Sequence, residues 1–173
     1  MKKIIFLGLL MVSINVTFGQ QKATPADEQG VRKTIDAMMK SWSNHNYNDI
    51  ATWTTPDVNW VNIVGMRWKG RDEVRIAHQA FHDTMFKNTP WTIKNVDIRF
   101  ITPDVAVANM LSHVGAFYPP DGVDHGGNKR SEADDMATLV FVKQQGNNWL
   151  LTAGENVVVD AEAARNNPVS AKR

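Results

Sequence analysis

Two histidines, His78 and His82, stand four residues apart, a spacing that puts both on one face of a helix. An imidazole titrates near neutral pH, so a histidine in a pocket is a natural general acid or base. A third histidine, His113, shares the alternating face of a later strand with apolar residues. It either lies among core residues or projects into a cavity. The plainer alternative for these residues is a structural imidazole held by hydrogen bonds.

The same three histidines have a spacing compatible with a His₃ metal site. No acid at the expected close spacing completes a metal motif within the helix. We keep metal binding as an alternative and predict that the chain uses no metal and no cofactor. The sequence contains no cysteine, which removes disulfides, thiolate metal sites, iron–sulfur clusters and cysteine nucleophiles.

Acidic and amide residues occur as neighbours on two predicted strands, Asp134 with Asp135 and Glu155 with Asn156. Neighbours on a strand point to opposite faces, so only one residue of each pair can face inward. An acid in an apolar interior has a raised pKa and can shuttle a proton. The alternative is a salt bridge to an arginine. The residues that we predict as acid–base groups are His78, His113, Asp135 and Glu155.

The chain has six Trp and seven Phe, and 43% of its residues are hydrophobic. This composition supplies a core and argues against a disordered chain. Some of the aromatic rings can line a site for a flat apolar ligand, although core packing is the more common role of such residues. The residues that we predict to contact a ligand are Trp42, Trp53, Trp60, Asn62, Met66, His82, Phe86 and Asn156.

Two helices are predicted in the first half of the chain. Thr24-Pro25-Ala26-Asp27 reads as an N-cap, a first-turn proline and a first-turn acid, and an apolar stripe then continues to about Asn44 to Asn46. Residues 48–54 can add a short helix before a turn at Thr55-Pro56-Asp57. A second helix follows Gly70, with His78 inside its apolar stripe and His82 at the edge of that stripe.

The remaining segments alternate with a period of two, which is typical of strands. A strand from Val58 to Val64 is predicted to be buried on both faces. Four long strands follow at 91–101, 105–118, 133–144 and 149–159, and their length favours a curved antiparallel sheet with bulges. The polar loop 119–128 is a possible pocket lid, and residues 161–173 form a loosely held tail.

The first residues, 1–19, resemble a secretory signal peptide, with a cationic start and the apolar run 4–12. We therefore expect a periplasmic or secreted protein, without membrane contact after cleavage, whose single domain spans residues 20–160. The 19 basic and 18 acidic residues nearly cancel, and two of the basic ones lie in this leader. Nucleic acid is accordingly not an expected partner.

Four stretches of the sequence resemble the SnoaL-like, nuclear transport factor 2-like superfamily, and more closely its SgcJ/EcaC-type (DUF4440) branch. They are VNWVNIVGMRWKGRD at 58–72, the segment 77–89 from AH through His82 to FKNT, PDVAV at 103–107, and WLLTAGEN at 149–156. The resemblance covers about residues 27 to 160. It implies an α+β roll of the cystatin-like kind, in which a cone-shaped, curved antiparallel sheet wraps around N-terminal helices. It also implies a homodimer formed through the outer face of the sheet.

The superfamily includes isomerases, dehydratases, polyketide cyclases, epoxide hydrolases and binders without catalysis, so one fold serves several functions. We predict that this chain binds a small apolar or aromatic molecule in the cone, with acid–base chemistry of isomerase, cyclase or dehydratase type as an added activity. A binding or dimeric accessory protein without catalysis is the alternative. The oxidoreductase label often given to the branch finds no support in a G-x-G-x-x-G motif or a phosphate loop.

Overall fold

The computed structural model describes residues 23–169, so the predicted signal peptide at residues 1–19 lies outside the described residues. Within this range the chain forms a six-stranded sheet and three α-helices. The elements are α1 (Pro25–Ser43), η1 (Ile50–Thr52), β1 (Thr54–Val61), β2 (Arg67–Lys69), α2 (Gly70–Asp83), β3 (Trp91–Thr102), β4 (Val105–Val114), β5 (Ala133–Lys143), η2 (Gln145–Asn147), β6 (Trp149–Val158) and α3 (Ala161–Ala164).

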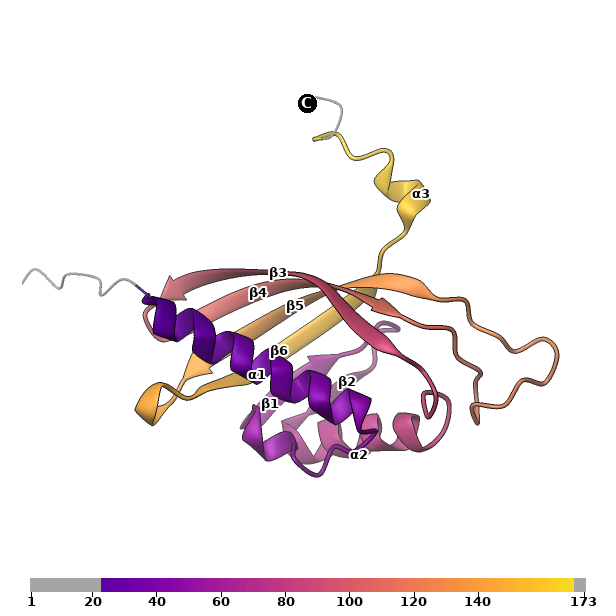
Figure 1. Ribbon diagram of the computed structural model, residues 1–173, viewed down its shortest axis with the longest axis horizontal. Helices are drawn as coiled ribbons and strands as arrows, with labels where there is room; N and C mark the ends of the chain where they lie inside the picture. The colour runs from indigo at the N-terminus through magenta and orange to yellow at the C-terminus, as the bar shows by residue number, and fades with distance from the viewer. Residues whose placement is uncertain (1–22, 170–173) are drawn as a thin grey trace, which may run out of the picture.

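The strands lie in the order β2-β1-β6-β5-β4-β3. The predicted α+β architecture is confirmed, but the sheet is mixed and not antiparallel throughout, because β1 pairs in parallel with β6. After β2 the chain continues through α2 into β3, β4 and β5. The last strand, β6, then lies beside β1 and runs in the same direction. Register shifts interrupt the β3–β4 and β5–β6 pairings, and such bulges bend a sheet. Figure 1 shows the resulting curved sheet with α1 running across it.

Helix α1 begins where the sequence predicts. The Thr24 side chain accepts a hydrogen bond from the Asp27 backbone N–H, and the Asp27 side chain accepts one from the Thr24 N–H, which completes a capping box. Asp27 is buried and also pairs with Lys143 of β5, at 2.7 Å between Oδ1 and Nζ. The Lys143 and Thr24 partners hold the pKa of Asp27 far below its usual range. One carboxylate therefore fixes both the start of α1 and its position on the sheet.

Two predictions about the region around β1 are wrong. Thr55-Pro56-Asp57, predicted as a turn, belongs to β1. Pro56 is tolerated there because β2 pairs only with Asn59 to Val61 and the pairing with β6 is interrupted between Thr54 and Asn59. The strand ends at Val61 and does not continue to Val64, so Ile63 and Val64 are exposed. The reason is a tight turn, in which Asn62 Oδ1 accepts hydrogen bonds from the backbone N–H groups of Val64 and Met66.

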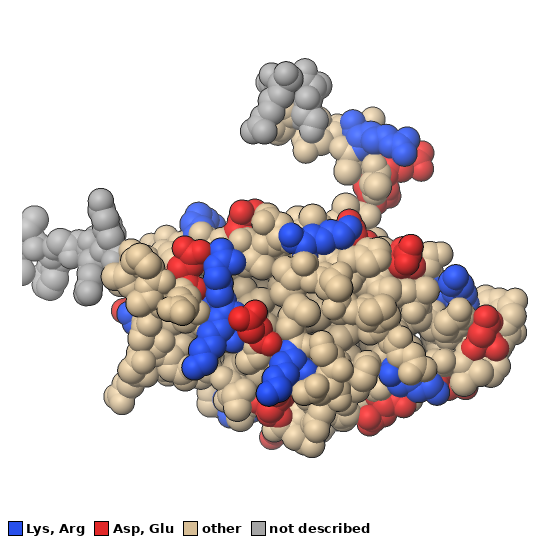
Figure 2. Space-filling view, in the orientation of Figure 1, with Lys and Arg blue, Asp and Glu red and all other residues tan. Residues whose placement is uncertain are grey.

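The main core fills the space between α1, α2 and the sheet. Its largest buried side chains include Trp53, Trp149 and Phe141. Residues 161–169, predicted as a loose tail, contain the short helix α3, which is exposed and projects away from the sheet (Figure 1). Basic and acidic side chains are interspersed on the face that Figure 2 shows. No helix among the described residues is long and apolar enough to cross a membrane.

Candidate functional site

Strand alternation decides which polar side chains face the helices. We call the side of the sheet covered by α1 and α2 the inner face, and the opposite side the outer face. Asp135 lies on the inner face and is only 7% exposed, and its partner Asn156 lies there too. Asp134, His113 and Glu155 lie on the outer face. Glu155, predicted as an acid–base group, therefore points away from the interior and is exposed.

A small polar cluster surrounds Asp135 on the inner face. The Ser112 hydroxyl donates to Asp135 Oδ1, and Asn156 Nδ2 donates to Asp135 Oδ2 at 3.1 Å. No lysine, arginine or histidine of residues 23–169 forms a salt bridge with this carboxylate. Burying a carboxylate without a cation is costly, and groups retained at such cost concentrate at functional sites. Asp135 is therefore the strongest acid–base candidate on the inner face.

His113 does not project into a cavity, as one of our predictions had it. Its Nδ1 lies 2.8 Å from Asp134 Oδ1, and Lys94 Nζ lies 2.6 Å from the same oxygen. The Lys94 and His113 hydrogen bonds lower the pKa of the Asp134 carboxyl. His113 is thus part of an ion-pair group on the outer face, because the odd-numbered residues of β4 point away from the helices.

His78 faces the interior, as predicted, and is surrounded by aromatic rings. Its ring centroid lies 5.1 Å from that of Tyr47, 5.3 Å from that of Trp60 and 5.2 Å from that of Trp68. Its Nδ1 lies 2.8 Å from the Val74 carbonyl oxygen, so Nδ1 carries the proton and Nε2 keeps a lone pair. Burial lowers the pKa of His78 to about 4, which leaves the imidazole neutral at pH 7.

His82 is only 2% exposed. The sequence predicts it at the edge of the apolar stripe of α2, so it is more deeply buried than predicted. Its Nε2 lies 3.1 Å from the Tyr47 hydroxyl, and its Nδ1 lies 2.8 Å from Nδ1 of His45. Burial, followed by the nearby His45 and His78, lowers the pKa of His82 to about 3. Burial also raises the pKa of Tyr47 well above its usual range. The position is deeper than predicted because the chain beyond α1, from His45 to Tyr47, closes over the helix face.

The structure does not bring the predicted metal ligands together. His78 and His82 pack against the Tyr47 ring on the inner face, whereas His113 lies on the outer face. Within residues 23–169 no group of three or more histidine and acidic side chains is arranged to hold a metal ion. The His₃ alternative is therefore contradicted by the position of His113.

The predicted ligand-contacting aromatic residues divide into two groups. Trp53 is core, with its Nε1 donating to Ser41 Oγ at 2.9 Å, and Trp60 packs against Gly154 of β6. Trp42 and Phe86 lie together near the end of α1, with ring centroids 5.4 Å apart. The two remaining predicted contacts, Asn62 and Met66, belong to the β1–β2 turn, where Met66 is exposed. That turn ends β1 before either side chain reaches the interior.

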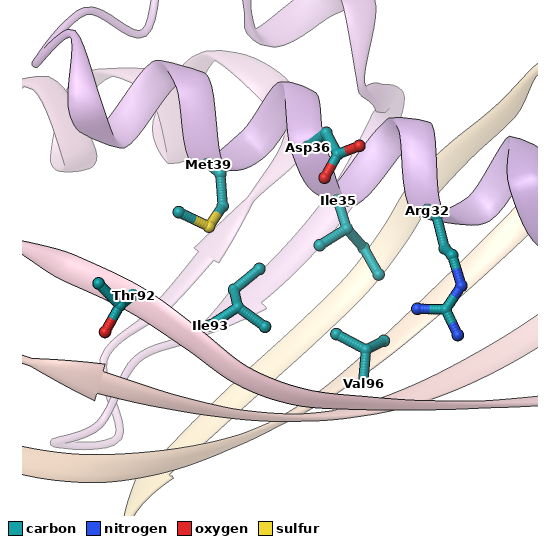
Figure 3. A pocket seen from close by; sticks show the side chains of 7 residues that line it. All are labelled: Arg32, Ile35, Asp36, Met39, Thr92, Ile93 and Val96. Carbon is teal, nitrogen blue, oxygen red and sulfur yellow. The ribbon is translucent and has the colours of Figure 1, made fainter.

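An open groove runs between α1 and β3, with a volume of about 500 Å³. Its lining residues, shown in Figure 3, are Arg32, Ile35, Asp36, Met39, Thr92, Ile93 and Val96. Ile35 and Met39 point from the helix toward Ile93 and Val96 of the strand, so the walls are apolar. Ile93 of β3 lies opposite Ser112 of β4, and the Ser112 hydroxyl donates a hydrogen bond to Asp135. The groove strand β3 is thus separated from β5, which carries the buried carboxylate, by β4 alone.

His45 is a site residue that sequence reasoning missed. It follows the C-terminal end of α1 and has a φ of 50°, a left-handed conformation that is uncommon for residues other than glycine. No periodic pattern marks such a position. The only available signal was its place among His45-Asn46-Tyr47-Asn48, a polar segment after an amphipathic helix.

Comparison with known proteins identifies relatives of this fold. No protein-family model matches the sequence, and no curated protein matches it. The crystal structure of an uncharacterized protein with a cystatin-like fold from Caulobacter vibrioides is 32% identical, with a TM-score of 0.77 over 84% of this chain and 98% of that one.

Two more distant solved structures show the same fold. A nuclear transport factor 2-like superfamily protein from Salmonella enterica serovar Typhimurium is 13% identical, with a TM-score of 0.64 over 79% of this chain and 93% of that one. A candidate dehydratase of the same family from Streptomyces avermitilis is 20% identical, with a TM-score of 0.63 over 80% of this chain and 100% of that one.

Proposed function

We propose that this chain, which is 32% identical to the protein with a cystatin-like fold from Caulobacter vibrioides, is a member of the SnoaL-like, nuclear transport factor 2-like superfamily. On that premise we propose that it binds a small apolar or aromatic molecule at the inner face of its sheet and moves a proton on it. Asp135 is the proposed acid–base group. The reaction class is that of a cofactor-independent isomerase, cyclase or dehydratase. Assignment to the SgcJ/EcaC-type branch remains a prediction.

One observation supports this proposal above the others: Asp135 is a buried carboxylate without a cationic partner. Ser112 and Asn156 each donate one hydrogen bond to it, which orients the carboxylate and leaves further lone pairs for a substrate proton. A buried carboxylate without a cationic partner is a suitable base for a proton next to a carbonyl group. Its outward-facing neighbour Asp134 is paired with Lys94 and hydrogen-bonded to His113, and lacks this setting.

The α1–β3 groove is the proposed entry for the ligand. Its volume of about 500 Å³ lies within the usual range for small-molecule sites, and its walls are apolar with a few polar groups at the rim. Ile93 in its wall pairs with Ser112 on the neighbouring strand, and the Ser112 hydroxyl donates to Asp135. A flat, mainly apolar molecule suits these walls.

The test uses 1-indanone, a flat aromatic ketone whose C2 protons exchange with solvent deuterium. We expect the protein to accelerate this exchange, because the Asp135 carboxylate removes a C2 proton and returns a deuteron. Asp135→Asn is expected to lower the exchange rate by at least about 100-fold, the usual minimum for loss of a general base. Proton NMR in D₂O measures the rate.

Asp134→Asn is the matched control, since it removes the neighbouring carboxylate on the outer face. It should leave exchange unchanged. If both variants exchange 1-indanone at the wild-type rate, Asp135 is not the proton-transfer group. Saturable binding of 1-indanone without any exchange would favour the alternative, a ligand-binding protein without catalysis.

A homodimer through the outer face is the second part of the proposal. Leu111, Met136 and Val157 form one cross-strand row on that face, and Met136 is 36% and Val157 51% exposed. Apolar rows of this kind are typical of interfaces between subunits. The proposal rests on this exposed row.

We expect light scattering after size-exclusion chromatography to give twice the mass of the chain for the wild type. Met136→Lys places a charge in the apolar row and should give a monomer. Ile76→Lys is the control, because Ile76 is an exposed apolar residue, more accessible than Met136, that lies on α2. A monomeric wild type would refute the dimer.

A further inference from the structure

A second groove lies between the C-terminal end of α1 and the turn that leads into β3. Its volume is about 500 Å³. The residues that line it are Trp42, Ser43, His45, Lys87, Asn88, Thr89, Pro90 and Trp91. None of them belongs to the Asp135 cluster or to the α1–β3 groove.

Two indole rings form the apolar part of this second groove. The ring centroids of Trp42 and Trp91 lie 5.0 Å apart, with the ring planes tilted by 42°. Trp42 is fixed in place because its Nε1 donates to the Thr89 carbonyl oxygen at 3.1 Å. The aromatic ring of a ligand in this groove can contact both indoles. Contacts between aromatic rings stabilise a complex beyond the area that they bury.

His45 supplies a hydrogen-bonding group that the fold holds in a defined orientation. Its backbone N–H donates to the Trp42 carbonyl oxygen at 2.9 Å, and its own carbonyl accepts from Gln79 Nε2 at 3.0 Å. Its Nδ1 is taken by His82, and no hydrogen bond to its Nε2 occurs within residues 23–169. The left-handed backbone at His45 is strained, and such strain is concentrated at functional sites.

The lining of the second groove has a basic side chain and no acidic one. Lys87 is its cation, and no aspartate or glutamate is among the lining residues. The α1–β3 groove differs in this respect, since Arg32 and Asp36 both line it. The loop 119–128, predicted as a lid, reaches the rim of the second groove. A Cβ atom added at Gly122 of this loop would lie 2.9 Å from Cε of Lys87. A lysine beside an open groove without acids favours an anionic ligand.

We infer that the second groove binds a small aromatic carboxylate. The aromatic ring lies against Trp42 and Trp91, and the carboxylate accepts hydrogen bonds from Lys87 and His45. This site is separate from the proposed proton-transfer site at Asp135. The two sites can therefore be tested independently.

The experiment titrates the protein with 2-naphthoate and follows quenching of its tryptophan fluorescence. The neutral analogue 2-naphthalenemethanol is titrated in parallel. We expect saturable binding of the carboxylate, and at least about tenfold weaker binding of the alcohol, since one charge-assisted hydrogen bond is lost. Lys87→Met and His45→Asn should each weaken 2-naphthoate binding by about tenfold, and asparagine is chosen because it tolerates the left-handed backbone.

Lys33→Met, an exposed lysine elsewhere on α1, is the matched control and should leave the affinity unchanged. Asp135→Asn should also leave it unchanged, which separates this inference from the proposed function. Circular dichroism checks that each variant is folded. Equal affinity for the acid and the alcohol, failure to saturate, or a loss of affinity in Asp135→Asn as large as in Lys87→Met would each overturn the inference.

Discussion

Replacing Trp60 with alanine is expected to lower the free energy of unfolding by about 3–5 kcal/mol, as for other buried aromatic residues. Trp60 is 9% exposed, and its ring lies against Gly154 and edge-on to His78, with ring centroids 5.3 Å apart. Removing it leaves a cavity between β1, β6 and α2. Urea unfolding followed by circular dichroism measures the change. A near-neutral result would mean that Trp60 lines open space and does not support the core.

Gly154 provides a paired test of the same contact. A Cβ at Gly154 would lie 2.5 Å from Cζ3 of Trp60, closer than real contacts allow. Gly154→Ala should therefore cost about 1–3 kcal/mol in the wild-type chain, the usual range for overpacking. In the Trp60→Ala background the added methyl group has room, so most of this penalty should disappear. A penalty of equal size in both backgrounds would show that the two residues do not interact.

Local signals in the sequence predict most of the fold. The cap at Thr24 and the four long period-two runs each specify an element through nearby residues. The errors at β1 have a different origin. Pro56 reads locally as a turn residue, yet it is accommodated in the strand because β2 is too short to pair with it. β2 starts after the Asn62 turn and ends at Lys69 because α2 begins at Gly70, and apolar alternation reveals neither limit.

The site is less predictable because alternation shows which residues share a face but not which face is covered. His113 and its strand-mates share one face, as predicted, yet that face is the outer one. Asp135 and Asp134 have identical side chains, and only the helices that cover one side of the sheet distinguish them. His45 contacts His82 through a backbone reversal after α1, across 37 positions in sequence. Tertiary packing, and not local pattern, therefore assembles the site.

Stability is expected to fall by several kcal/mol between pH 6.5 and about pH 4, because the buried His82 and the half-buried His78 are held as neutral rings. The pKa of His78 is lowered from 6.5 to about 4 and that of His82 from 6.5 to about 3, both mainly by burial. In this range the unfolded chain binds protons at both residues and the folded chain does not. Acid therefore favours unfolding, by up to about 1.4 kcal/mol per pH unit for each histidine.

Carboxyl groups with a lowered pKa, such as Asp27, do not account for this pH range. The lowered pKa of Asp27 contributes stability above its unfolded value of 3.8, and that contribution is lost only as the pH falls below it. Urea unfolding at pH 7, 6, 5 and 4 measures the curve. His82→Phe should be less stable at pH 7, since Tyr47 and His45 lose a partner, but its stability should depend less on pH.

His125→Gln is the matched control, because this histidine is exposed in the loop after β4. It should keep the wild-type pH dependence. A flat wild-type curve from pH 6.5 to 4 would mean that both imidazoles become protonated without unfolding the chain. An unchanged slope in His82→Phe would assign the effect to His78 alone. Either result would show that protonation of His82 costs the folded state little free energy, which requires the closed segment after α1 to admit a charge.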